Sequence, residues 1–322
     1  MVKLLSNLNL AFYFLSDDRT VRLAGIDRRE VFFADEEMYE RELLLGSDLP
    51  PQVLHRRLSL DPEQRAQHLL VQSIKRAEQW IQSQAVRGSS QGESSVNALY
   101  SDILSRIAKV PLNTELPVPN DVSTLERRMS TLEDRSKTFA TYGLLPEFHG
   151  KEILEIVRTA APTHAGLVSS VLTPYLESVE KKLDAMEGLQ RQINALVVLV
   201  NSFYTRKHLL YEIHDGFQIL TDDGKPIQPH MLSSGERHLL LLFCNTIQAL
   251  DKPSIFMIDE PEISLNIKWQ RRLLPALREC AGQNPVQYLF ATHSFEILAQ
   301  CRDNTIKLNG ALEQMNGSET NC

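Results

Sequence analysis

SIFMIDEPE, residues 254–262, is a run of mostly apolar residues that ends abruptly in acidic ones. Such a continuous apolar run predicts a strand buried on both faces of a parallel sheet. Asp259 and Glu260 then lie at the carboxyl end of the strand, the edge of an open α/β sheet where ligands bind. Consecutive strand residues point in opposite directions, so we expect different tasks for the two carboxylates. Asp259 is placed to hold the water shell of a Mg²⁺ ion, and Glu260 to orient and deprotonate an attacking water.

A second motif, Leu232 to Glu236 (LSSGE), precedes an apolar helix expected from Arg237 to about Leu250. The N-terminus of a helix offers free N–H groups and the positive end of the helix dipole, so it attracts anions. Ser233 adds a hydroxyl donor, and Gly235 lets the backbone approach a phosphate closely. Ordinary helix capping by serine explains the same residues, and this segment alone leaves both interpretations open.

A third apolar run, Val286 to Ala291, is followed by Thr292, His293 and Ser294. If this run is a neighbouring parallel strand, His293 also lies at the carboxyl edge of the sheet, where an imidazole can hydrogen-bond a terminal phosphate. A solvent-facing histidine at a strand end is the simpler explanation for His293 in isolation. The order of the three motifs favours the phosphate site.

Together these motifs resemble the ATP-binding cassette (ABC) superfamily over about residues 196–308. Leu232 to Glu236 is similar to its signature motif, Ile255 to Glu260 to its Walker B strand, and His293 to its switch histidine. Glu262 to Asn266 occupies the place of its D-loop. The Asp-Glu-Pro-Glu form is similar to the non-transporter branch, which includes DNA-repair and SMC-like ATPases, OLD-family ATPases and ATPases of Septu anti-phage systems.

The resemblance implies an α/β fold, a parallel-sheet P-loop NTPase core of the ABC type with a large α-helical insertion. It implies ATP and Mg²⁺ as ligands, with Glu260 and His293 as catalytic residues and Asp259 as the magnesium residue, acting through water. Four residues of the signature motif would contact the γ-phosphate of ATP held by another subunit: Ser233, Ser234, Gly235 and Glu236.

That mode of ATP binding implies a homodimer or higher oligomer formed through the ATPase core. In this branch such ATPases control a partner effector, often a nuclease, in antiviral defence. Nucleic acid stays an open question as a further partner. Asn266 is a departure from the branch, which often has histidine at this position.

The motif G-x-x-x-x-G-K-[ST], which cradles nucleotide phosphates, does not occur in the 322 residues. Neither Gly150-Lys151 nor Gly224-Lys225 follows an apolar strand with a glycine-rich loop, and neither continues into serine or threonine. Because the backbone N–H groups of that loop bind phosphate strongly, we expect these residues alone to bind ATP weakly. A start site downstream of the true N-terminus, a cassette split between two chains, and a degenerate cassette would each explain this, and we favour the first.

The sequence predicts four regions. Residues 1–20 carry a residual core strand of the ATPase lobe at Leu10 to Leu15. Residues 21–205 form a helical insertion, with a loop at Gly88 to Gly92, a linker marked by Pro111, Pro117 and Pro119, and a long helix from about Leu167 to His208. Its apolar positions from Met186 to Phe203 recur three and four residues apart, which favours an amphipathic helix over an extended coiled coil. Residues 206–308 form the C-terminal ATPase core, and 309–322 a flexible tail.

Composition sets limits on the class of protein. A net charge of −7 argues against a surface devoted to nucleic acid. The apolar segments are all shorter than the roughly 20 residues of a membrane span, so we expect no membrane association and a cytoplasmic protein. The scattered Cys244, Cys280, Cys301 and Cys322 predict reduced thiols.

Two other functions fit the same residues. One is a cassette remnant without catalysis, whose helical insertion binds a partner protein as a scaffold. The other is a DNA-repair ATPase of the SMC-like kind, whose hydrolysis DNA would stimulate.

Overall fold

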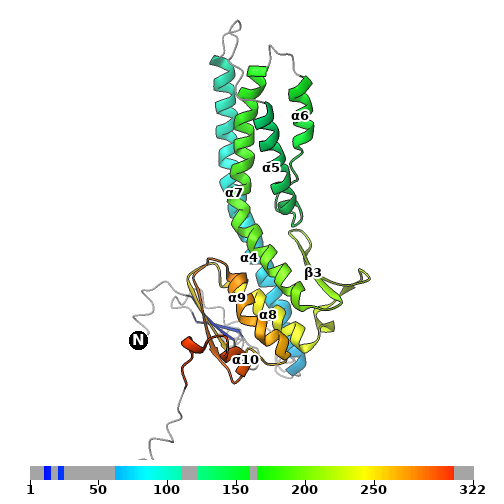
Figure 1. Cartoon of the computed structure of the whole chain (residues 1–322), viewed down its shortest axis with the longest axis vertical. Coiled ribbons are helices and arrows are strands. Elements are labelled where there is room, and N and C mark those ends of the chain that lie inside the picture. The colour runs from blue at the N-terminus through cyan, green and yellow to red at the C-terminus, as the bar shows by residue number, and fades with distance from the viewer. Residues whose placement is uncertain (1–10, 16–20, 25–61, 110–121, 160–164, 308–322) are drawn as a thin grey trace, which may run out of the picture.

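The computed structural model describes residues 11–15, 21–24, 62–109, 122–159 and 165–307. The linker prolines and the 309–322 tail lie outside these residues. Within them, no helix is both long and apolar enough to cross a membrane. Two parts are visible in Figure 1: an α/β core at one end and a tall bundle of helices that extends away from it.

A four-stranded sheet lies at the centre of the core. Its strands are β1 (Ala11–Leu15), β2 (Val21–Ala24), β6 (Ser254–Asp259) and β7 (Val286–Ala291), in the order β2-β1-β6-β7. β1, β6 and β7 are parallel, and β2 is antiparallel at the edge. The sequence therefore predicted β1 correctly to within one residue, and with it the parallel sheet.

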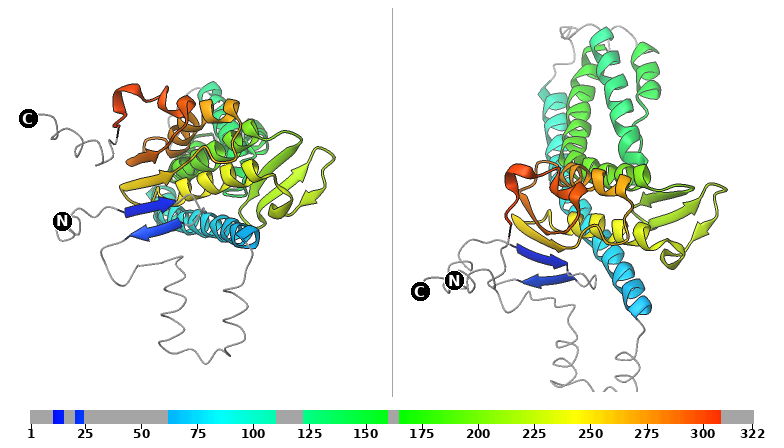
Figure 2. Two further views of the ribbon diagram at one scale, coloured as in Figure 1. Left: turned by 90° about the horizontal axis from the view of Figure 1, so that it is seen from below. Right: turned by 60° about the horizontal axis from the view of Figure 1, so that its bottom comes forward.

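One face of this sheet packs on two helices, α8 (Ser234–Gln248) and α9 (Ile267–Ala281). The hydroxyl of Tyr13 on β1 donates to the Gln248 carbonyl oxygen at 3.1 Å, and that of Tyr288 on β7 donates to the Leu277 carbonyl oxygen at 3.2 Å. Figure 2 shows the sheet at one end of the core and the β3–β5 segment at the other.

The opposite face of the sheet is more open than the apolar run of β6 predicted. Phe256 and Ile258 are buried, but the alternate side chains Ile255 and Met257 are only half-buried. On β7, Leu289 is 47% exposed. The prediction of a strand buried on both faces was therefore wrong, because helix packing covers only the Phe256 side completely.

The helical insertion consists of α4 (Pro62–Lys109), α5 (Val122–Ala140), α6 (Gly150–Thr159) and α7 (Ala165–Phe203). α4 and α7 run side by side out of the core, with α5 and α6 beside them at the far end (Figure 1). The predicted apolar seam of α7 packs on its neighbours, because six of its residues are buried: Met186, Leu189, Ile193, Leu196, Val200 and Phe203.

Two sequence predictions about these helices were wrong. The expected loop at Gly88 to Gly92 is part of the continuous helix α4. Gly88 lies against α7, where a Cβ atom would come within 2.6 Å of the flexible Met186 Sδ and 3.4 Å of the Ala185 carbonyl oxygen. The long helix ends at Phe203 rather than at His208, because Arg206 adopts a left-handed backbone with φ 61° and the next residues form a strand.

That strand, β3 (Lys207–Glu212), pairs with β4 (Gly216–Thr221), and β4 pairs with the short β5 (Pro226–Ile227). A single 3₁₀ turn, η3 (Pro229–Met231), leads from β5 into α8. After β7 the chain forms the short helix α10 (Phe295–Leu298) and the 3₁₀ turn η4 (Arg302–Asn304).

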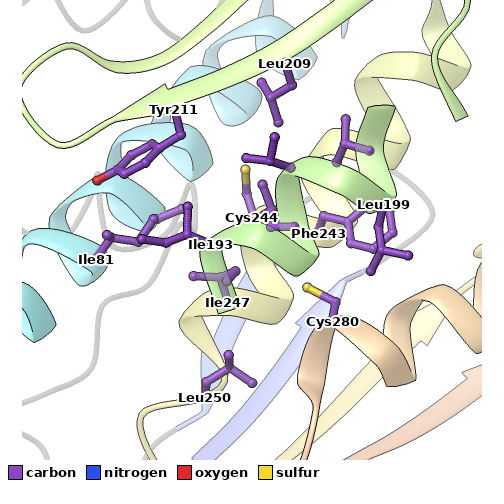
Figure 3. Close-up of a cluster of buried hydrophobic side chains, with 14 of the residues drawn as sticks. Ile81, Ile193, Leu199, Leu209, Tyr211, Phe243, Cys244, Ile247, Leu250 and Cys280 are labelled. Atoms are coloured by element: carbon purple, nitrogen blue, oxygen red, sulfur yellow. The ribbon is translucent and has the colours of Figure 1, made fainter. Parts of the chain in front are cut away.

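The core and the insertion share one hydrophobic cluster, shown in Figure 3. It brings Ile81 of α4 and Ile193 of α7 together with Ile247 of α8. Cys244 and Cys280 lie in the same cluster as free, buried thiols, and Cys301 is a half-buried one. Burial raises the pKa of Cys280 to about 12 and that of Cys244 further, so both thiols stay protonated.

Replacing Ile193 by alanine is expected to lower the free energy of unfolding by about 2–5 kcal/mol, because Ile193 is fully buried where three helices meet. Val198→Ala on the same helix is the matched control. Its side chain is 53% exposed, so its effect should stay within about 0.5 kcal/mol. Urea unfolding of both variants checks this, and equal effects would contradict the description of the shared cluster.

Candidate functional site

The ends of β6 and β7 bring three of the sequence-predicted residues together. The register pairs Asp259 with Ala291, and the Glu260 N–H donates to the Ala291 carbonyl oxygen at 2.8 Å. His293 therefore follows β7 directly beside Glu260, with its Nε2 3.6 Å from the Glu260 Oε1. The His293 side chain is 94% exposed and that of Glu260 27% exposed. A carboxylate and an imidazole thus face solvent at the carboxyl edge of the parallel sheet.

The backbone after β6 is unusual. Glu260 and Ser264 have positive φ angles of 47° and 66°, a region that residues other than glycine rarely adopt. The turn between them is closed by the Ile263 N–H, which donates to the Glu260 carbonyl oxygen at 3.0 Å. Strained backbone of this kind concentrates at functional sites, where the surroundings hold it in place.

The electrostatic surroundings of Glu260 suit a general base. Partial burial raises the pKa of Glu260, and the neighbouring carboxyl of Glu262 raises it further, while His293 opposes the change. A carboxylate with a raised pKa accepts a proton more readily, which is the property a base needs to activate water near neutral pH.

Ser233 and Glu236 form a capping box at the start of α8. The Glu236 N–H donates to the Ser233 Oγ at 3.3 Å, and the Ser233 N–H donates to the Glu236 Oε2 at 2.7 Å. Helix capping, the simpler sequence interpretation, is thus present in the structure. Ser233 and Ser234 are exposed, and because the Ser233 oxygen only accepts in this box, its O–H is left to donate elsewhere.

Glu236 itself is buried rather than exposed to a ligand. The Lys207 Nζ donates to the Glu236 Oε2 at 2.7 Å, and the Tyr204 hydroxyl donates to the Glu236 carbonyl oxygen at 3.1 Å. Burial opposes ionisation of Glu236, but the bonds from Lys207 and from the Ser233 backbone outweigh it and lower its pKa. Its charge therefore holds the start of α8 in place.

The start of α8 lies against the segment that follows β6. A Cβ atom on Gly235 would come within 2.6 Å of the Ser264 carbonyl oxygen, so this close approach requires glycine. The sequence assigned Gly235 only to a close approach of phosphate, and the structure adds this contact inside the chain. Asn266, the departure from the branch pattern, caps α9, because its side chain accepts from the Trp269 N–H at 3.0 Å.

Sequence reasoning assigned no contact to three residues that connect these parts. Lys207 pairs with Glu236, and His238 of α8 places its Nε2 3.1 Å from the Pro261 carbonyl oxygen. Glu262 accepts bonds from the segment that carries His293. The S-x-x-E spacing of Ser233 and Glu236 could have revealed the capping box. No local pattern reveals the partners of Lys207, His238 or Glu262, because those partners are distant in sequence.

A family model described as "AAA domain, putative AbiEii toxin, Type IV TA system" matches residues 7–299. The chain belongs to this AAA-domain family. Curated relatives carry ABC names. The chain is 30% identical over 93 residues to the "Uncharacterized ABC transporter ATP-binding protein YejF" of Escherichia coli, across 29% of this chain and 17% of the relative.

The chain is also 27% identical over 92 residues to the molybdenum import ATP-binding protein ModC of Aliivibrio fischeri, across 29% of this chain and 24% of the relative. It thus spans less than a quarter of the length of either relative. An Smc head domain from Pyrococcus furiosus, bound to the C-terminal domain of ScpA, aligns with a TM-score of 0.29 and 12% identity, across 68% of this chain and 51% of that one.

The chain is thus an AAA-family domain, with ABC ATP-binding proteins among the relatives that it matches in part. No group of three or more histidine, cysteine, aspartate or glutamate side chains in the described residues is arranged to hold a metal ion. Mg²⁺ commonly uses only one or two carboxylates, with its own waters and the phosphates of a nucleotide. Asp259, half-buried at the end of β6, is a suitable carboxylate for that mode.

Lys207→Met is expected to lower the free energy of unfolding at neutral pH by about 2 kcal/mol, because it leaves the buried Glu236 charge without its cation. Folding lowers the pKa of Glu236, so the stabilisation is present above the unfolded pKa and is lost as the pH falls through the folded value. The gap between wild type and variant should therefore shrink in acid.

Lys225→Met serves as the matched control. Lys225 also pairs with a carboxylate, Asp223, at 2.7 Å, but its side chain is 78% exposed. Its replacement should cost less than about 1 kcal/mol. Urea unfolding at several pH values compares the two variants. A Lys207→Met effect no larger than that of the control would show that the pair does not hold α8.

Proposed function

We propose that this AAA-family ATPase domain binds ATP and Mg²⁺ at the carboxyl ends of β6 and β7, dimerises around the nucleotide, and regulates a partner effector such as a nuclease in anti-phage defence. The observation that carries the proposal is the pairing of Glu260 with His293 at 3.6 Å, at the ends of adjacent parallel strands. This is the sheet edge at which α/β folds bind ligands.

Each residue has a role in the proposal. Asp259 holds the water shell of Mg²⁺, which neutralises phosphate charge when bound. Glu260 orients the attacking water and accepts its proton, and its raised pKa supports this role. His293 reaches the γ-phosphate with an imidazole that is almost fully exposed. Phosphoryl transfer asks a protein mainly for this kind of positioning and charge stabilisation.

In the proposed dimer the start of α8 contacts ATP held by the partner. Ser233 and Ser234 are exposed and lie at a helix N-terminus, which favours a bound anion. Gly235 keeps the helix start against the Ser264 carbonyl, and Glu236 fixes it from the buried side. In this proposal Glu236 supports the contact with the γ-phosphate indirectly, through the capping box.

Exposed apolar side chains beside the motifs support a covered interface. Phe295 is 87% exposed directly after the His293 segment, Ile267 is 58% exposed at the start of α9, and Met231 is 56% exposed just before the signature motif. Large apolar side chains that flank functional motifs are common where a partner covers them.

The partner effector is proposed from the family and from the insertion. The description of the family names an AbiEii toxin of a Type IV TA system, which is compatible with a role in defence. Helices α4 to α7 extend well beyond the core and offer a surface for a partner (Figure 1). Of the expected boundaries, we keep the core strand in 1–20 and the C-terminal core in 206–308. The insertion, expected over 21–205, starts after β2 instead, because Val21–Ala24 pairs with β1 in the core sheet.

One observation favours a second function, a scaffold without catalysis. The 322 residues contain no G-x-x-x-x-G-K-[ST] motif, and ATP held only by the strand ends would bind weakly. ATP hydrolysis by an assembly that supplies this loop would favour the ATPase, and no hydrolysis by that assembly would favour the scaffold. Stimulation of that hydrolysis by DNA would instead favour a DNA-repair ATPase.

Glu260→Gln is expected to lower ATP hydrolysis at least about 100-fold in an assembly that contains the phosphate loop, because the amide cannot accept the proton of water. ATP binding should survive, so ATP-loaded dimers should accumulate. Phosphate release and light scattering measure the two effects. Glu279→Gln, an exposed position on α9, should change neither. Unchanged turnover in Glu260→Gln would remove Glu260 from the proposed role.

A further inference from the structure

Glu262 connects the ends of the two strands that form the site. Its Oε1 accepts three bonds from consecutive residues after β7: from the Thr292 hydroxyl at 2.6 Å, the His293 N–H at 3.0 Å and the Ser294 N–H at 2.9 Å. The Ser294 N–H is shared with the Thr292 Oγ1 at 3.0 Å. One carboxylate oxygen thus binds the side chain of Thr292 and the backbone N–H groups of His293 and Ser294.

This arrangement fixes the backbone of His293 and leaves its ring exposed. The imidazole is 94% exposed, whereas the His293 N–H points back to Glu262. Immediately downstream, the Ser294 Oγ donates to the Gln270 Oε1 of α9 at 2.8 Å and accepts from the Ile297 N–H at 3.4 Å. A fixed backbone with an exposed ring is the arrangement a ligand-contacting side chain requires.

Glu262 is itself held in position. The Leu265 N–H donates to the Glu262 carbonyl oxygen at 2.9 Å. The preceding residue, Pro261, accepts at its carbonyl oxygen from the buried His238 of α8, at 3.1 Å from Nε2. The anchor for His293 is therefore tied to the same helix that begins with Ser233.

Glu262 has a bonding pattern that stability alone does not explain. Its Oε1 takes all three donors, while the Glu262 carboxyl also lies against the carboxyl of Glu260 and raises the pKa of Glu260. Two neighbouring carboxyls oppose each other's ionisation, and such pairs occur where function sets the position of a side chain.

We propose that Glu262 is a positioning residue, whose single oxygen fixes the segment 292–294 so that the His293 ring is held beside Glu260. The inference rests on the proposed function for the importance of His293, but the contact itself does not depend on ATP. Two substitutions separate geometry from charge. Glu262→Gln keeps an acceptor oxygen on a side chain of the same length without the charge, whereas Glu262→Ala removes the acceptor.

Hydrogen exchange of the full chain, followed by NMR, tests the proposal. In Glu262→Ala the His293 and Ser294 amides should exchange about 10–100-fold faster, the range expected for loss of a bond to a charged acceptor. Glu262→Gln should restore part of this protection. Glu296→Gln is the control, because Glu296 lies nearby on α10 and pairs with Arg271 at 2.6 Å outside this contact.

A second measurement distinguishes positioning from a purely structural role. ATP and Mg²⁺ are added while the ring signals of His293 are recorded, with assignment from a His293→Gln sample. The ring response should be kept in Glu262→Gln and reduced in Glu262→Ala, while circular dichroism shows that both variants fold.

Unchanged amide exchange in folded Glu262→Ala would overturn the inference. An undiminished response of the His293 ring to ATP and Mg²⁺ in the same variant would overturn it as well. If the ring of the wild type does not respond to ATP, the proposed function fails, and the exchange rates still decide whether Glu262 fixes the segment. The two failures are therefore distinguishable.

Discussion

The parallel pairing of β6 with β7 is the constraint on which the site depends. Because the register places Asp259 opposite Ala291, the residues that follow each strand leave the sheet at the same edge. Glu260 and His293, which are far apart in sequence, then meet without further rearrangement. β1 extends the same parallel sheet on the other side of β6, and helices α8 and α9 support the Phe256 side.

Two carboxylates, the buried Glu236 and the half-buried Glu262, connect this sheet edge with its surroundings. Glu236 is paired with Lys207 and fixes the start of α8, and Glu262 bonds the segment after β7. Between them, His238 contacts the Pro261 carbonyl oxygen and ties α8 to the turn after β6. The start of α8 is therefore connected through these contacts to the segment that carries His293. Burying the charges of Glu236 and Glu262 costs desolvation free energy. Their bonds fix the start of α8 and the segment after β7 relative to the rest of the core.

Apolar runs and motif order were sufficient to predict the parallel sheet, its β1 strand and the meeting of Asp259, Glu260 and His293. These features depend on local pattern and on the rule that parallel strands end at one edge. The helix through Gly88 was mistaken for a loop, because the local sequence does not show that this part of α4 lies against α7. Lys207, the partner of Glu236, and residues 292–294, the partners of Glu262, were missed because these contacts form only in the tertiary structure.

Paramagnetic broadening by ATP with Mn²⁺ in place of Mg²⁺ tests most directly whether the nucleotide lies at these strand ends, and weak binding in fast exchange is sufficient for it. The ring signals of His293 should broaden first, while those of the exposed His149 and His208, outside the strand ends, remain sharp at the same concentration. Mn²⁺ without ATP provides the reference. Equal broadening of all three histidines, or broadening of His293 that ATP does not increase, would contradict an ATP site at the ends of β6 and β7.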